Sequence, residues 1–217
     1  MKFRELTLQT NCLLETEKFY REKLGLLIDR RSEDFISFQV GVSKLAFVKT
    51  KTIKRPTYHF AFSIPNNKLE ESITWLEKKI QIIHLETGPI VKFSNWNARS
   101  IYFFDNNGNI LEFICRDDLN NYSSDDFSSK SIQSINEVGL VNDSPIEFCE
   151  KIISQINTGF YQEGPVSEMF CALGANSGLL VISSSKRNWF PTDQLAQFFP
   201  LKLIVNVLDE DQILDFF

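Results

Sequence analysis

One pattern occurs three times along the 217 residues: a strand whose side chains alternate between two faces, a polar turn, and an amphipathic helix. The copies begin at Glu5, His59 and Glu137. They read ELTLQTNCLLETEKFYREKLGL, HFAFSIPNNKLEESITWLEKKI and EVGLVNDSPIEFCEKIISQI. Self-similarity at a spacing of this kind is typical of a repeat architecture. The repeat predicts an α+β fold built from tandem βαβββ units.

Apolar spacing predicts the helices of these units. Residues at i, i+3 and i+4 indicate a helix through Phe19 and Leu24, which Gly25 would end, and a second helix from Leu69 to Ile80. Short β-rich runs follow each helix. They are FISFQV and KLAFVK in the first unit, IVKF, SIYFF and ILEFI in the second, and MFCAL and GLLVI in the third.

These elements predict the domain organisation. Residues 1–117 hold two complete units, and the Asn-Asn-Gly-Asn stretch at 106–109 predicts a hairpin turn in the second unit. A polar run rich in Ser, Asp and Asn makes 118–132 a linker. Residues 133–217 hold a third unit and an incomplete fourth, in which LKLIVNVLDEDQILDFF resembles a first strand and the start of a helix.

Composition excludes several classes of protein. With 43% hydrophobic and 24% charged residues, the chain can bury a full core, so the disordered and fibrous classes are excluded. The net charge of -5 and the lack of a basic face argue against nucleic acid as a partner. The four cysteines form no C-x-x-C pair, which argues against a zinc knuckle and a secreted disulfide framework. Without a signal peptide or a long apolar run, we expect a cytoplasmic protein with no membrane partner.

Strand alternation singles out three polar residues. In YHFAFSI the aromatic side chains share one face, and His59 lies on the other with small neighbours. Glu5 has the equivalent position in the first unit, and Glu112 lies between Ile110 and Ile114 on the face opposite to its own core neighbours. A carboxylate there is costly to bury unless a positive charge, such as a metal ion, meets it. Each residue alone is more typical of an ordinary core or solvated strand position than of a metal ligand, so only the joint pattern favours a metal site.

Together the βαβββ layout, FYREKLGL after ELTLQTN, the HFAF strand and DNNGNILEF resemble the vicinal oxygen chelate superfamily. That superfamily includes glyoxalase I, bleomycin-resistance proteins and extradiol dioxygenases. The resemblance covers residues 1–117 and continues more loosely through 133–208. It implies tandem modules that form a cupped mixed sheet. Metal ligands there come from the first strand of each unit and the last strand of the second, which implies Glu5, His59 and Glu112.

The same resemblance implies residues of a substrate pocket. IYFFDNNGNILEF is similar to the extradiol pattern in which a tyrosine ten residues before the last ligand touches the substrate, so Tyr102 is the candidate catalytic residue. An ordinary β-strand aromatic is the alternative. Trp96, Asn97 and Arg99 precede this strand and either border the pocket, with Arg99 meeting an anionic substrate, or cap a strand end.

Several residues depart from the family pattern. Extradiol enzymes have a histidine where this chain has Glu5, and His84 lies on no matching motif. The additional carboxylate of glyoxalase I falls on Ala46. In the third unit Glu137 matches the first-strand ligands but Val181 falls where Glu112 would be, so we expect no second metal site there.

Two hypotheses of function remain. The first is a metal-dependent lyase, isomerase or dioxygenase that holds Fe, Mn, Ni or Zn and binds a small molecule through vicinal oxygens. The second is a metal-free binding protein of the bleomycin-resistance kind, with an aromatic-lined groove for its ligand. The C-terminal half would cover the cup or form a homodimer contact, with Trp189 and Phe190 as packing anchors.

Overall fold

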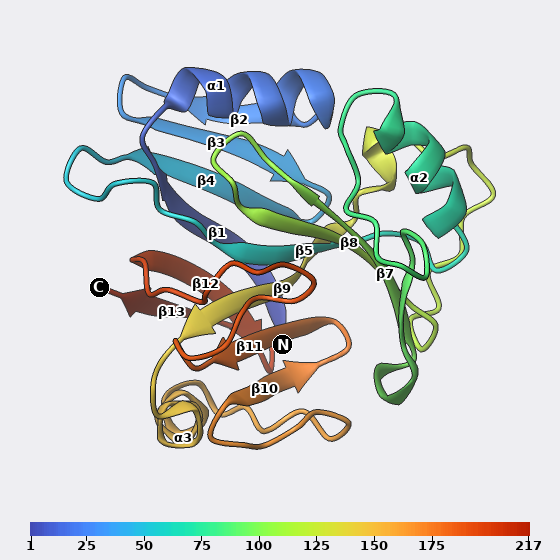
Figure 1. Cartoon of the computed structure of the whole chain (residues 1–217). Coiled ribbons are helices and arrows are strands. Elements are labelled where there is room, and N and C mark those ends of the chain that lie inside the picture. The colour runs from blue at the N-terminus through green and yellow to red at the C-terminus, as the bar shows by residue number, and fades with distance from the viewer.

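The computed structural model describes residues 1–217 and has two curled sheets with helices on their outer faces (Figure 1). Sheet A contains, in spatial order, β13 (Glu210–Phe216), β12 (Leu201–Val207), β1 (Lys2–Thr10), β4 (Ser43–Lys49), β3 (Phe35–Val40) and β2 (Leu27–Arg31). Sheet B contains β10 (Phe170–Ala175), β11 (Gly178–Ser183), β9 (Ser134–Val141), β5 (His59–Ser63), β8 (Ile110–Arg116), β7 (Ala98–Phe104) and β6 (Val91–Phe93). Both sheets mix parallel and antiparallel pairs, which confirms the predicted α+β fold with cupped mixed sheets.

Three helical segments accompany the sheets. They are α1 (Leu13–Glu17) with its π-helical continuation η1 (Lys18–Lys23), α2 (Leu69–Glu77) and α3 (Pro145–Ile156); η2 (Ser94–Trp96) and η3 (Ser129–Ser131) are single 3-10 turns. Gly25 follows the first helix with a φ of +68°, a left-handed conformation that suits glycine, as the sequence predicts. The second helix ends at Glu77, before the predicted limit at Ile80. None of the helices has the length and apolar character needed to cross a bilayer.

Strands of different repeated units pair with each other in both sheets. In sheet B, β5 of the second unit runs antiparallel to β9 of the third. In sheet A, β1 of the first unit runs antiparallel to β12. The strands of residues 1–117 are therefore divided between the two sheets (Figure 1). The boundaries of the predicted domains stay a prediction.

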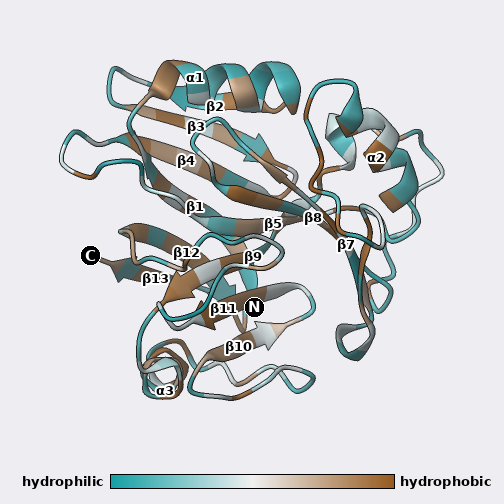
Figure 2. Ribbon diagram, in the orientation of Figure 1, coloured by the Kyte–Doolittle hydropathy of each residue, from teal (hydrophilic) through white to brown (hydrophobic).

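A single cluster of 42 buried hydrophobic residues extends through both sheets. It includes Tyr58, Phe60 and Phe62, whereas Ala61 on the opposite face of β5 is outside it, so the predicted face assignment is confirmed. Figure 2 shows the hydrophobic residues along the strands and the hydrophilic ones on loops and outer helix faces. Because β5 turns its aromatic side chains into this core, its other face is available for a site.

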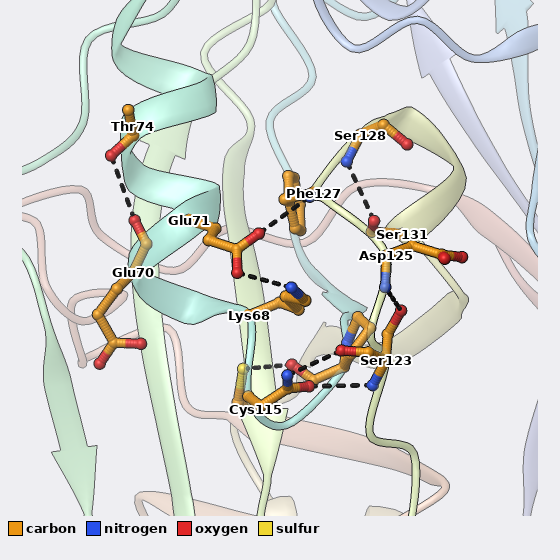
Figure 3. Close-up of polar contacts among 12 residues, drawn as sticks. Lys68, Glu70, Glu71, Thr74, Cys115, Ser123, Asp125, Phe127, Ser128 and Ser131 are labelled. Carbon is orange, nitrogen blue, oxygen red and sulfur yellow. Dashed lines mark hydrogen bonds and ion pairs between the residues drawn. The ribbon is translucent and has the colours of Figure 1, made fainter.

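The segment after β8 is fastened to α2 by polar contacts (Figure 3). Glu71 accepts hydrogen bonds from the Lys68 ammonium at 2.6 Å and from the backbone N–H of Phe127 at 3.0 Å. The Phe127 ring is buried and packs edge-on against Trp75, with 5.4 Å between the ring centroids. These contacts fix the path by which the chain enters β9.

The last residues differ from the expectation. The sequence pattern predicts that a helix follows β12, but residues 210–216 form the strand β13, which pairs antiparallel with β12. Leu208 and Asp209 both have positive φ values, 50° and 64°, so the chain reverses in a tight two-residue turn. Alternate residues of EDQILDF then place Leu214 in the core. The incomplete fourth unit is therefore a hairpin on the edge of sheet A.

Candidate metal centre

Three buried ligand-type side chains meet on the inner face of sheet B. His59 comes from β5, Glu112 from the neighbouring β8, and Glu137 from β9 on the other side of β5. One ligand atom of each lies within 4.8 Å of the others. The exposed fractions of His59, Glu112 and Glu137 are 6%, 2% and 4%, so bulk water does not solvate the two carboxyl groups.

Strand register explains why these three side chains converge. On β8, Glu112 lies opposite the residue two positions after His59 in β5. On β11, Val181 lies opposite the residue two positions after Glu137 in β9. The second and third units thus contribute equivalent pairs of positions to one site, and an apolar Val181 takes the fourth position. Three of the four positions carry a group that can ligate a metal.

The imidazole of His59 is held in one tautomer. Its Nδ1 lies 3.1 Å from the carbonyl oxygen of Ile110, and since a carbonyl only accepts, Nδ1 carries the proton. Nε2 then has a free lone pair and lies 3.7 Å from Oε2 of Glu112, too far for a hydrogen bond. Burial, with a smaller effect from Arg187, lowers the pKa of His59 to about 4. The ring is therefore neutral at pH 7, the state that binds metals.

The Glu112 carboxyl group has one buried oxygen without a hydrogen-bond partner. Burial and, to a smaller degree, the nearby Glu137 carboxylate raise the pKa of Glu112 to about 8. Its Oε2 is buried and has no hydrogen-bond partner. A buried carboxylate oxygen without a hydrogen-bond partner, beside a free imidazole nitrogen, is a donor arrangement that suits a divalent cation.

Glu137 has a partner that the sequence interpretation missed. The guanidinium of Arg116 pairs with Oε1 of Glu137 and donates from Nε to Oδ1 of Asn136 at 2.9 Å. Arg116 is fully buried, and its guanidinium lies 5.8 Å from the centroid of the Trp96 ring. Strand alternation could have predicted that Arg116 points to the same side as Glu112, because the two residues are four positions apart in ILEFICR and share a face.

A cavity of about 480 Å³ opens over the three ligands. Trp189, in the long loop between β11 and β12, lies over the site with its ring centroid 5.2 Å from that of His59. Gly139 makes room for this ring, because a Cβ at that position would lie 2.8 Å from it. The lining residues are His59, Phe93, Ser94, Asn95, Trp96, Tyr102, Glu112, Ile114, Glu137, Phe170, Val181, Arg187, Trp189 and Phe190.

Two of the predicted pocket residues line this cavity. Tyr102 of β7 lies directly opposite Glu112 of β8 in the antiparallel pair, and Trp96 lies at the end of η2. Burial and the charge of Glu112 hold the pKa of Tyr102 well above its usual value. Its hydroxyl is therefore a proton donor at neutral pH. A catalytic role for Tyr102 stays a prediction.

Asn97 and Arg99 lie outside the cavity. Asn97 donates from its side chain to Asp118 at 2.7 Å. Arg99 points to the face of β7 opposite to Tyr102, where it pairs with Glu70 at 3.3 Å and Asp117 at 3.6 Å. Strand alternation explains the difference, since residues 99 and 102 have opposite parity.

Glu5 is not brought to His59. It lies on β1 in sheet A, where it accepts a hydrogen bond from Thr7 at 3.2 Å and faces the Arg30 guanidinium at 3.8 Å. Glu137 takes its place beside His59 and Glu112. The third unit therefore contributes a ligand-type side chain to the cluster of the second unit. The sequence feature that could have predicted this is the position of Glu137, which is equivalent to that of Glu5.

Comparison with known proteins gives relatives of one kind. The metallothiol transferase FosB of Staphylococcus haemolyticus is 31% identical over 113 residues, which cover 49% of this chain and 78% of FosB. A candidate dioxygenase from Bacillus subtilis superposes with a TM-score of 0.60 at 14% identity, over 84% of this chain and 63% of its own length. A lactoylglutathione lyase from Agrobacterium tumefaciens has a TM-score of 0.43 at 23% identity, over 51% of this chain and 90% of its own. No family model matches the chain.

The similarities to FosB and to the Bacillus subtilis structure support each other. The identity with FosB extends over more than two thirds of that protein, and the Bacillus subtilis structure shares the fold over most of this chain, although the chain spans only 63% of its length. The chain belongs to the vicinal oxygen chelate superfamily.

Proposed function

We propose that the protein is a metal-dependent enzyme of the glyoxalase or dioxygenase type, in which His59, Glu112 and Glu137 hold a divalent ion. A single observation carries this proposal: three buried ligand atoms lie within 4.8 Å of one another at an aromatic-lined cavity. The substrate would be a small molecule that binds through vicinal oxygens.

The residues present fit such an ion. His59 offers a neutral Nε2 whose tautomer is fixed by a backbone carbonyl, as is usual for metal-binding histidines. The unpartnered Oε2 of Glu112 lacks a positive partner that an ion would supply. One imidazole and two carboxylates suit Mn, Fe, Ni or Zn and do not select sharply among them. Val181 offers no fourth ligand, so substrate oxygens have room to bind.

The surrounding side chains have separate tasks. The ion would supply Lewis-acid polarisation of a bound oxygen. Tyr102, with its high pKa, keeps its proton and can donate a hydrogen bond to an oxyanion of the substrate. Trp189 and Tyr102 keep bulk water from the site, since both rings are buried against the cavity.

A second candidate function is supported by one observation. The guanidinium of Arg116 already neutralises Glu137 in the absence of any ion. A metal-free binding protein of the bleomycin-resistance kind would retain such a pair and use the cavity for sequestration. This hypothesis predicts that ligand binding survives a chelator and the His59→Ala substitution.

Metal content tests the proposal. We expect about one equivalent of metal by inductively coupled plasma mass spectrometry after incubation with Mn, Fe, Ni or Zn and removal of free ion. Glu112→Gln and Glu137→Gln should lose that metal. Glu5→Gln is the matched control, because Glu5 has the equivalent strand position in sheet A, and it should keep the metal. Two results would refute the ligand set. One is a wild type that holds no metal after reconstitution. The other is a Glu5→Gln variant that loses the metal while Glu137→Gln keeps it.

Assembly and location stay predictions. The candidate site is complete within one chain, since β5, β8 and β9 belong to one sheet. The homodimer and the cytoplasmic location expected from the sequence are therefore separate proposals, which light scattering and cell fractionation would test.

A further inference from the structure

Arg187 is a cation at the cavity that has no carboxylate partner in the protein. It lies in the loop between β11 and β12 (Figure 1), and its guanidinium lies over the Phe170 ring at 4.4 Å from the centroid. It makes no ion pair and no side-chain hydrogen bond, unlike Arg99 and Arg116. Arg187 is half-buried and lines the cavity, whereas the adjacent Lys186 is exposed.

An unpaired guanidinium in such a place is suited to a ligand. Arginine does not lose its proton in proteins, so burial leaves a permanent charge partly stripped of water. Its planar fork of donors matches two oxygens of one carboxylate. Stacking on Phe170 fixes the plane of the group without using its N–H donors. The donors therefore remain available to whatever enters the cavity.

The walls of the cavity are aromatic. His59 aside, six of its lining residues carry aromatic rings, and they come from β7, β10, the segment around η2 and the loop after β11. Such walls favour a flat apolar body over a flexible or strongly hydrated one. The six are Phe93, Trp96, Tyr102, Phe170, Trp189 and Phe190.

We propose that the substrate is an aromatic carboxylate whose carboxylate binds Arg187 while its ring lies between the aromatic walls. This inference rests on the proposed function, because it gives the substrate class of the same site. Arg187 and the cluster of His59, Glu112 and Glu137 line one cavity, so a single ligand can contact both. With a divalent ion bound, the positive charges of the ion, Arg116 and Arg187 exceed the two carboxylate charges, which favours an anion.

Paired probes that differ in charge test this proposal. 2-Naphthoate and 2-naphthamide have the same ring and nearly the same shape, and isothermal titration calorimetry gives the dissociation constant of each. In EDTA, where no metal contributes, we expect the wild type to bind 2-naphthoate at least about tenfold more tightly. Arg187→Gln should remove this preference, and Arg187→Lys should retain part of it. Lys186→Gln is the matched control and should leave the preference unchanged.

The outcomes separate this proposal from the metal proposal. Equal affinity for the two probes in the wild type, no binding of either probe, or a preference that survives Arg187→Gln would overturn the assignment of Arg187. The metal content of Arg187→Gln should equal that of the wild type, because Arg187 is not among the ligands. If the wild type binds no metal after reconstitution but still prefers 2-naphthoate, the metal site is refuted and Arg187 remains the anion-binding residue.

Discussion

Arg116 gives the sharpest test of the electrostatics at the site. Arg116→Met keeps most of the side-chain volume and removes the charge that faces Glu137. Since Glu137 is 4% exposed and lies close to the Glu112 carboxylate, it must then be protonated in the folded state. Protonating a glutamate of ordinary pKa at pH 7 costs about 4 kcal/mol. This value lies within the range of about 3–5 kcal/mol for breaking a buried ion pair.

The loss of stability should depend on pH. Without Arg116, the pKa of Glu137 in the folded state is raised further above its unfolded value, because burial and Glu112 no longer meet an opposing charge. Relative to the wild type, the destabilisation is therefore complete above the folded-state pKa of the variant. It disappears below the folded-state pKa of the wild type, which burial already holds above the unfolded value. Urea denaturation in EDTA should give a difference from the wild type of up to about 4 kcal/mol at pH 7 and of less than about 1 kcal/mol at pH 5.

Two control variants isolate the cause. Arg116→Met combined with Glu137→Leu removes both charges and should recover much of the lost free energy of unfolding. Arg4→Met breaks the exposed pair with Asp211, whose side chains are 3.5 Å apart, and should change the free energy far less. A loss for Arg116→Met below about 1 kcal/mol at pH 7, or a loss that is equal at pH 5, would refute the reasoning.

Three further substitutions test the packing described above. Tyr20→Phe removes the buried 2.7 Å hydrogen bond to Asp105 and should lower the free energy of unfolding by about 1–3 kcal/mol in urea titrations; an unchanged midpoint would contradict the bond's role. Gly41→Ala would place a Cβ 1.8 Å from the carbonyl oxygen of Gln133 at a φ of +53°, so we expect a loss above about 2 kcal/mol by thermal unfolding, and a wild-type melting temperature would argue against this packing. Gly139→Ala should displace the indole ring over the cavity and shift tryptophan emission to longer wavelength, whereas emission at the wild-type wavelength would mean that the ring stays in place.

Local elements were predictable because their signals are local. The run FISFQV coincides with β3, and GLLVI lies within β11, since apolar residues in short stretches bounded by turn residues specify strands. The alternation of YHFAF also placed His59 on the face away from the core. The C-terminal residues were misassigned because the turn at Leu208 and Asp209 has no glycine or asparagine to mark it.

The partners of His59 could not be taken from local patterns. Repeated units present equivalent strands, so the sequence does not say whether β5 pairs with β1 or with β9. Glu5 and Glu137 fit the pattern equally well, and only the long-range pairing of sheet B selects Glu137. The roles of Arg116 and Arg187 could not be predicted for the same reason. The two residues lie on different units, and only the pairing of those units brings both to one cavity.

The division of the units between two sheets has a consequence for the order of assembly. β5 pairs with β9, with Ala61 opposite Glu137, so the three ligand-type side chains can come together before β12 is synthesised. β1 must wait for β12, because Lys2 pairs with Asn206 near the other end of the chain. Until then one edge of β1 is open and able to pair with strands of other molecules. A nascent chain therefore keeps this open edge until β12 emerges, and a fragment that stops at residue 117 would retain two such edges permanently.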